Sequence, residues 1–188
     1  DGDGVARGLD DIRLNEFTTA SQTAPELVAT ADGGFFVLFR SSADAPGGDG
    51  DGDAVMLRRF DYDVGTAAAT ASGPSEVVNT FTTANQFDAA AAELAGGGSV
   101  VAWTSSAQDG QGAGVYAQMF DAAGARMGGE FRVSDLRRPA QDAPEIAALD
   151  NGGFVIVYDD DARDGSGAGV FAQQYDASGA RGDGPIQV

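Results

Sequence analysis

Residues 151–181 read NGGFVIVYDDDARDGSGAGVFAQQYDASGAR, and this stretch decides the fold because the chain repeats it. A sister copy runs from 96 to 126 (GGGSVVAWTSSAQDGQGAGVYAQMFDAAGAR), and a looser copy begins at Asp32 (DGGFFVLFRSSADAPGGDGDGDAVMLRRFDYDVG). Each copy holds a turn, an apolar strand, a Gly/Asp loop, a second strand and a second turn. Self-similarity of this kind indicates a tandem array in which neighbouring units bury each other's apolar faces.

Turn and strand signals predict four short strands in each unit. They lie at 12–17, 26–30, 35–40 and 54–60, at 76–80, 89–95, 99–104 and 115–120, and at 131–134, 145–149, 154–159 and 170–175. The Asp after the last strand recurs at 61, 121 and 176, in steps of 60 (121 − 61) and 55 (176 − 121). The sequence therefore predicts one repeat domain over 1–188, made of units 12–75, 76–130 and 131–188.

The expected fold is all-β, with tandem four-stranded antiparallel units that resemble β-propeller blades. Frequent Gly and the lack of helical spacing argue against helices. Three units are too few to close a propeller, and a first-strand segment recurs at 186–188 as a surplus copy. We expect either an excerpt from a longer array or an assembly that pairs sheet edges between chains. A three-fold β-prism or β-trefoil is the alternative.

Composition narrows the classes of partner. The net charge of −18 repels nucleic acid and anionic lipid, and no apolar run approaches the roughly 18 residues of a membrane span. The chain has no Cys, so a disulfide framework is absent. Asp outnumbers Glu by 23 to 6, which indicates acids placed in turns and loops. The opening DGDG is typical of an internal cut or a mature end.

Three motifs recur: NxxTxxxQ, LxxGGFVVVW and DGxGxGVYxQxFDxxG. In the second unit they read NTFTTANQ, LAGGGSVVAW and DGQGAGVYAQMFDAAG. They resemble a repeat of very large secreted or surface proteins of Gram-negative bacteria, often found beside RTX-type calcium-binding or adhesin modules. The resemblance implies export, a calcium-rich setting and a role in adhesion or matrix structure. The first unit departs from the pattern through its expanded loop and its Arg58–Arg59 pair.

Acidic loops are the candidate metal sites. One Asp precedes the last strand of every unit and is followed by Gly. In the first unit the segment DGDGD (49–53) alternates Asp with Gly. In the third unit the segment 159–164 holds another acidic cluster. These carboxylates could bind calcium, or they could form turns and solvated loops. The candidate calcium ligands are Asp49, Asp51, Asp53, Asp109, Asp159, Asp161 and Asp164.

An aromatic residue ends the third strand of each unit, at Phe39, Trp103 and Tyr158. We expect these rings to fill the space between sheets. Trp103, Tyr116 and Tyr158 are candidates for stacking on sugars if they prove exposed.

Catalysis has little support in the sequence, because the chain lacks His, Cys and Lys and so lacks the usual nucleophile–base pairs. Two carboxylates facing each other across a cleft could still hydrolyse glycosides. The sequence thus predicts a secreted or cell-surface repeat module, non-enzymatic and calcium-stabilised, for adhesion or extracellular assembly. Its expected partners are other copies or neighbouring repeats at open sheet edges, and surface glycans. A lectin-like carbohydrate-binding module is the first alternative, and a carboxylate-based glycosidase or lyase is the second.

Overall fold

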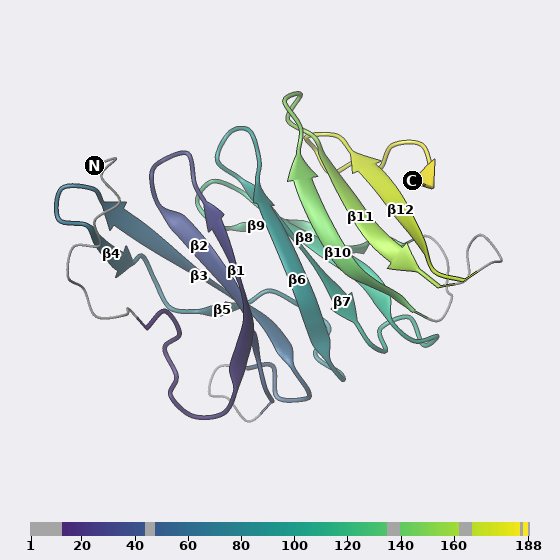
Figure 1. Ribbon diagram of the computed structural model, residues 1–188, viewed down its shortest axis with the longest axis horizontal. Helices are drawn as coiled ribbons and strands as arrows, with labels where there is room; N and C mark the ends of the chain where they lie inside the picture. The colour runs from purple at the N-terminus through teal and green to yellow at the C-terminus, as the bar shows by residue number, and fades with distance from the viewer. Residues whose placement is uncertain (1–12, 44–47, 135–139, 162–166, 185, 188) are drawn as a thin grey trace.

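A computed structural model describes residues 13–43, 48–134, 140–161, 167–184 and 186–187. Within these ranges every regular element is a strand, and the strands form three antiparallel sheets that follow one another along the molecule (Figure 1). The prediction of an all-β fold is therefore confirmed. No sheet in the described part closes on itself.

The sheets are numbered here in chain order. The first sheet contains β1 (Gln22–Ala29), β2 (Phe35–Ser41), β3 (Ala54–Asp63) and β4 (Ala68–Ala71), and β5 (Glu76–Val77) also pairs with β3. The second contains β6 (Gln86–Glu93), β7 (Ser99–Ser105), β8 (Gly114–Phe120) and β9 (Arg126–Arg132). The third contains β10 (Gln141–Ala148), β11 (Phe154–Asp160), β12 (Gly169–Tyr175) and β13 (Ile186–Gln187).

The three copies of the quoted stretch adopt the same strand layout. Each forms a central hairpin in one register, which begins with the pairs Phe35–Phe60, Ser99–Phe120 and Phe154–Tyr175. The hairpin ends with the pairs Ser41–Ala54, Ser105–Gly114 and Asp160–Gly169. Equivalent residues of different sheets can therefore be compared directly.

The outermost strand of each sheet includes the segment that begins the next sequence unit. Val77, Arg132 and Gln187 pair with equivalent residues of β3, β8 and β12. The sheets are thus shifted relative to the units 12–75, 76–130 and 131–188. Residues 13–17, which belong to the strand expected at 12–17, form no strand. Instead Leu14 packs against the first sheet, and Asn15 donates a hydrogen bond to Gln22 of β1.

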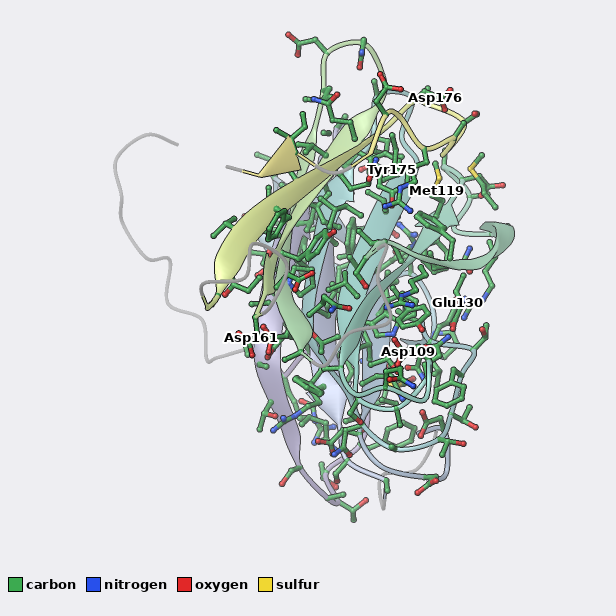
Figure 2. The ribbon with its side chains drawn as sticks, turned by 90° about the vertical axis from the view of Figure 1, so that its right-hand side faces the viewer. Asp109, Met119, Glu130, Asp161, Tyr175 and Asp176 are labelled. Carbon is green, nitrogen blue, oxygen red and sulfur yellow. The ribbon has the colours of Figure 1, made fainter. Side chains whose placement is uncertain are left out.

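Apolar side chains between consecutive sheets form the core. Phe36, Leu38 and Leu57 of the first sheet pack against Trp103 and Tyr116 of the second. On the other face of the second sheet, Val100, Ala102 and Ala117 pack against residues of the third sheet that include Ile156 and Tyr158. Figure 2 shows Met119 and Tyr175 in this second contact. The second sheet is covered on both faces, so every residue of β7 and β8 is buried.

The third sheet differs from this pattern. The apolar run 154–158 predicts a strand covered on both faces, yet burial alternates along β11. Phe154, Ile156 and Tyr158 face the second sheet, whereas Val155 and Val157 are only half-buried. The reason is that no further sheet of the described part covers the second face.

Polar ties connect one sheet to the next. Asn79 Oδ1 accepts a hydrogen bond from Val55 N in β3 (3.0 Å), and Asn79 Nδ2 donates to Oε1 of Gln86 at the start of β6 (3.0 Å). Asn15 and Gln22 repeat the second bond (3.0 Å). The NxxTxxxQ motif is therefore a structural tie, and buried polar groups of this kind must keep their partners.

Asn79→Ala should lower the free energy of unfolding by about 2–3 kcal/mol, because it removes the acceptor of the buried Val55 N–H and the donor to Gln86 Oε1. Asn15→Ala is the matched control. Asn15 is half-buried and has fewer bonds, so its loss should cost less than about 1 kcal/mol. Urea denaturation measures both, and equal losses would contradict the proposed tie.

Candidate functional site

The strands β1, β6 and β10 each form one edge of a sheet, and β6 contacts both of the others (Figure 1). We call these three strands the inner edge. Each carries a β-bulge at an equivalent place, where Ala24 (φ 52°), Asp88 (φ 48°) and Ala143 (φ 49°) adopt the left-handed region. Non-glycine residues in this region are strained, and bulges commonly redirect side chains at functional sites.

Carboxyl groups from all three sheets lie on the strands that carry these bulges. Glu26 follows the bulge of β1, and its pKa is raised by burial and by the neighbouring charge of Glu145 in β10. The pKa of Asp142, which precedes the bulge of β10, is raised by burial and then by the charges of Asp159, Asp161 and Asp88. Acids of different sheets therefore lie within electrostatic reach of each other.

Two of these acids have raised pKa values. Glu26 and Asp142 are half-buried, so their carboxyl groups hold a proton to a higher pH than an ordinary carboxyl group does. Glu145 and Asp88 are exposed to solvent. A carboxyl group whose pKa is raised in this way can serve as a general acid.

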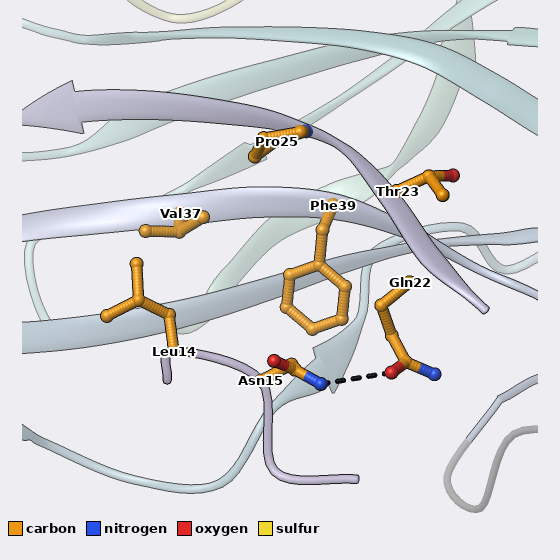
Figure 3. A pocket seen from close by; sticks show the side chains of 7 residues that line it. All are labelled: Leu14, Asn15, Gln22, Thr23, Pro25, Val37 and Phe39. Carbon is orange, nitrogen blue, oxygen red and sulfur yellow. Dashed lines mark hydrogen bonds between the residues drawn. The ribbon is translucent and has the colours of Figure 1, made fainter. Parts of the chain in front are cut away.

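A groove of about 570 Å³ lies between the first and second sheets, beyond the ends of β1 and β6. Its polar lining includes Asp32, Arg59, Asp61 and Glu93. Glu93 accepts hydrogen bonds from Ala31 N at 2.8 and 3.0 Å and so joins the two strand ends. A smaller pocket of about 130 Å³ lies under Leu14, between Val37 and Phe39 (Figure 3).

The acidic loop 49–53 is occupied by protein contacts. Asp49 accepts hydrogen bonds from Asn79 Nδ2 (2.8 Å) and from Asp51 N (3.3 Å), and burial raises its pKa. Asp53 forms an ion pair with Arg40 (3.4 Å). The turn interpretation of this loop therefore has direct support.

Asp109 is the equivalent acid of the second sheet. Its Oδ1 accepts a hydrogen bond from Gln111 N (2.8 Å), and its Oδ2 lies 2.9 Å from Nη2 of Arg132. The Asp109 side chain is 4% exposed, so this ion pair is largely shielded from water. A guanidinium group already stands where a metal ion was expected.

The third acidic loop is partly described. Asp159 is half-buried and Asp161 is exposed, whereas Asp164 lies outside the described residues. Asp161 lies apart from Asp109 and Glu130 (Figure 2). The described ranges contain no group of three or more acids close enough to hold a metal ion. The described contacts of Asp49, Asp53 and Asp109 are with protein groups, and calcium binding by these residues stays a prediction.

The three aromatic candidates lie in the core. Trp103 is 0%, Tyr158 1% and Tyr116 6% exposed, and all three pack between sheets. The exposure that sugar stacking requires is therefore not met. These rings fill the spaces between sheets, as their recurrence in the sequence indicates.

The sequence did not single out Glu26, Asp88, Asp142 or Glu145. The available signal was the Pro–Glu pair that recurs at 25–26 and 144–145, directly after the bulge in β1 and β10. Nothing in the local sequence indicates that these acids meet, because they come from different sheets.

Comparison with solved structures shows a shared fold. An endo-arabinase from Bacteroides thetaiotaomicron matches 88% of this chain with a TM-score of 0.54 and 11% identity, and the match covers 61% of the enzyme. A Bacillus subtilis arabinanase matches 89% with a TM-score of 0.50 and 16% identity, over 59% of its length. A thermostable family-43 glycoside hydrolase matches 89% with a TM-score of 0.52 and 7% identity, also over 59%.

The chain spans less than two thirds of the length of these enzymes. At these identities the likeness is one of fold. No protein-family model matches the chain, and no curated protein matches its sequence. Among the described residues, none forms a helix with the length and hydropathy needed to span a membrane.

The comparison corrects the expected function. The sequence predicted a non-enzymatic, calcium-stabilised module for adhesion or extracellular assembly, but the structures that share its fold are glycoside hydrolases. The prediction against enzymatic activity relied on the missing His, Cys and Lys. That criterion does not apply to glycoside hydrolysis, which needs only two carboxyl groups.

Asp142→Asn should stabilise the protein at pH 7. The pKa of Asp142 is higher in the folded state than in the unfolded state. At a pH between these two pKa values, folding is coupled to the uptake of a proton. The free energy of unfolding therefore falls as the pH rises through this range. The amide removes this penalty. The melting temperature should rise at pH 7 and stay unchanged near pH 3. Asp61→Asn, an exposed site on β3, controls for the lost charge, and an equal rise there would contradict the prediction.

Arg132→Gln should lower the free energy of unfolding by about 2–4 kcal/mol, because it leaves the buried Asp109 carboxylate without its partner. The double variant with Asp109→Asn should recover part of this loss, since no buried charge then remains. Chemical denaturation of both single variants and the double variant measures the coupling, and strictly additive effects would rule out the ion pair as the cause.

Proposed function

We propose that the three sheets are blades of a β-propeller, and that the chain belongs to a protein that hydrolyses glycosidic bonds with carboxyl groups of its inner edge. The described residues lack His and Cys, so acid–base work at this edge would fall to Asp and Glu. Glycoside hydrolases use a pair of carboxyl groups, one protonated and one ionised.

The observation that carries this proposal is the unequal distribution of acids over equivalent positions. By register, Glu26 and Glu145 correspond to Ala90 of the second sheet. Asp142 corresponds to Thr23 and Phe87. Asp88 corresponds in the same way to Ala24 and Ala143. Structural acids would recur in every unit, as the loop acids do. None of these three positions is acidic in all units, so the gathering of their acids at one edge supports a single shared site.

The roles follow from the environments. Half-buried Glu26, with its raised pKa, is the candidate general acid that protonates the leaving oxygen. Exposed Glu145 is its candidate partner, which as a carboxylate activates water or stabilises the positive charge of the sugar. Asp142 and Asp88 form the second candidate pair. The polar groove beside β1 and β6 could hold flanking sugars.

Two sequence-based predictions remain open in this proposal. Export, implied by the repeat resemblance, would suit an enzyme that acts on extracellular polysaccharide. Calcium binding stays a prediction for all seven candidate ligands, Asp49, Asp51, Asp53, Asp109, Asp159, Asp161 and Asp164.

Incubation with a panel of polysaccharides that includes arabinan, the substrate class of two structural neighbours, tests the proposal by the release of reducing ends. Glu26→Gln should reduce the hydrolysis rate roughly 10²- to 10⁴-fold, the contribution of a general acid. Glu76→Gln, an exposed Glu on the outer strand β5, is the matched control and should retain full activity.

Two results would contradict the proposal. One is the absence of hydrolysis by the wild-type chain on every polysaccharide of the panel. The other is a hydrolysis rate that is equally affected by Glu26→Gln and Glu76→Gln. Circular dichroism of both variants shows that a lost rate does not reflect lost folding.

A further inference from the structure

The groove between the first and second sheets has a smaller counterpart between the second and third sheets. The first groove measures about 570 Å³, and its counterpart, at the equivalent end of the sheets, measures about 210 Å³. The two linings correspond in the sequence repeat, because Gly97 and Ala122 of the first groove are matched by Gly152 and Ala177 of the second. The two grooves can therefore be compared residue by residue.

The grooves differ in the chemistry of their linings. By register, Arg59 of the first groove takes the position that Met119 takes in the second. Glu93, which also lines the first groove, takes the position that Ala148 holds in the third sheet. Charged side chains thus stand in the first groove at positions that are apolar at the next junction between sheets.

Packing between the sheets does not require the charge of Arg59. Its side chain packs over Gly124, in the β8–β9 turn of the second sheet, so closely that a Cβ atom added to Gly124 would lie 2.9 Å from Nε. Met119 packs over Gly179 of the third sheet in the same way, with Sδ 2.5 Å from such an atom. An uncharged side chain therefore makes the same contact at the next junction.

The guanidinium group of Arg59 is held in place and keeps donors for a ligand. Its Cζ lies 5.4 Å from the centroid of the ring of Phe36, the cross-strand partner of Arg59. Within the described ranges Arg59 donates one hydrogen bond, a long one from Nη2 to Ser99 Oγ (3.4 Å). The donors on Nε and Nη1 thus remain for a ligand, in the planar fork that suits two neighbouring oxygen atoms.

Acceptor groups stand beside these donors. The pKa of Asp32 is lowered by hydrogen bonds with Thr30 and with the backbone of Gly34, and also by the charge of Arg59, so Asp32 lies within electrostatic reach of Arg59. The Asp61 and Glu93 carboxylates line the same groove. A ligand of either charge would meet a like charge here, whereas the hydroxyl groups of a sugar both donate and accept hydrogen bonds.

The groove lies within reach of the candidate catalytic acid. By register, Glu26 and Arg59 belong to the same face of the first sheet, the face that packs on the second sheet. From Glu26 the chain runs along β1 to Thr30 at the groove, and these four residues of extended strand span about 13 Å. This distance is longer than one sugar unit, so a ligand that occupies both places is a chain of sugars.

We propose that this groove binds a stretch of a neutral polysaccharide whose cleaved bond lies at Glu26, and that Arg59 is the residue that binds its hydroxyl groups. The inference rests on the proposed glycosidase function and adds the class of substrate to it. The substrate is a polymer rather than a short glycoside, and Arg59 sets the preference for it.

Calorimetric titration of the Glu26→Gln chain with arabinan and the other neutral polysaccharides of the panel tests this inference, because this variant keeps the groove without consuming the ligand. Adding Arg59→Met should weaken binding about ten- to a hundredfold, the contribution of hydrogen bonds to a charged group. The Met side chain preserves the contact between sheets, as Met119 does. Arg40→Met, at the other end of the β2–β3 hairpin, is the matched control and should leave binding unchanged.

Equal affinities of the Arg59→Met and Arg40→Met chains would overturn the inference, and so would a Glu26→Gln chain that binds none of the polysaccharides. The proposed function is judged separately, by hydrolysis. A wild-type chain that cleaves a polysaccharide without dependence on Arg59 keeps the proposed function and loses this inference. Binding that depends on Arg59 in a chain without hydrolysis supports the groove and contradicts the catalytic proposal. Thermal melts show that each variant remains folded.

Discussion

The structure depends on the burial of sheet faces against each other. The second sheet shows the full arrangement, with Trp103 directed toward one neighbour and Val100 and Ala102 toward the other. A two-sided strand of this kind gains stability from both contacts, at roughly 25 cal/mol for each Å² of apolar surface removed from water. No sheet carries its own closed core, so stability in this molecule is a property of neighbouring pairs, as in other repeat proteins.

Packing and chemistry occupy different parts of the repeat. The central hairpins share one register in every unit, because each must fit the same kind of neighbour. The inner edge differs from unit to unit: the position of Glu26 holds Ala in the second unit, and the position of Asp88 holds Ala in the other two. Variation at this edge leaves the packing unchanged, since these side chains lie outside the apolar contacts between sheets.

The central strands and the aromatic residues between the sheets could be predicted from the sequence, because both follow from a local sequence pattern. The alternation and turn signals gave the central hairpins nearly to the residue, and the recurring ring at Trp103 and Tyr158 indicated its place between sheets. The position of the outermost strands could not be predicted in this way. Segment 76–77 pairs backward with β3, and that choice is made by a neighbouring strand rather than by its own composition.

The acids show the same limit. An Asp before a Gly has the same local pattern whether it binds a cation or forms a turn, and the ion-pair partner of Asp109 is Arg132, a residue 23 positions later (132 − 109). Glu26 and Glu145 are separated by most of the chain and meet only after three sheets have packed. Long-range electrostatics of this kind has no signature in a single sequence.

The Asn79–Gln86 tie has a consequence for how such a chain can grow. Both residues belong to one short segment, which leaves one sheet and enters the next, so a gene duplication that copies the segment also copies the junction. A new unit inserted by unequal recombination meets neighbours that already match it on both sides. Arrays of this repeat can thus lengthen or shorten in single steps, without the evolution of a new interface at each addition.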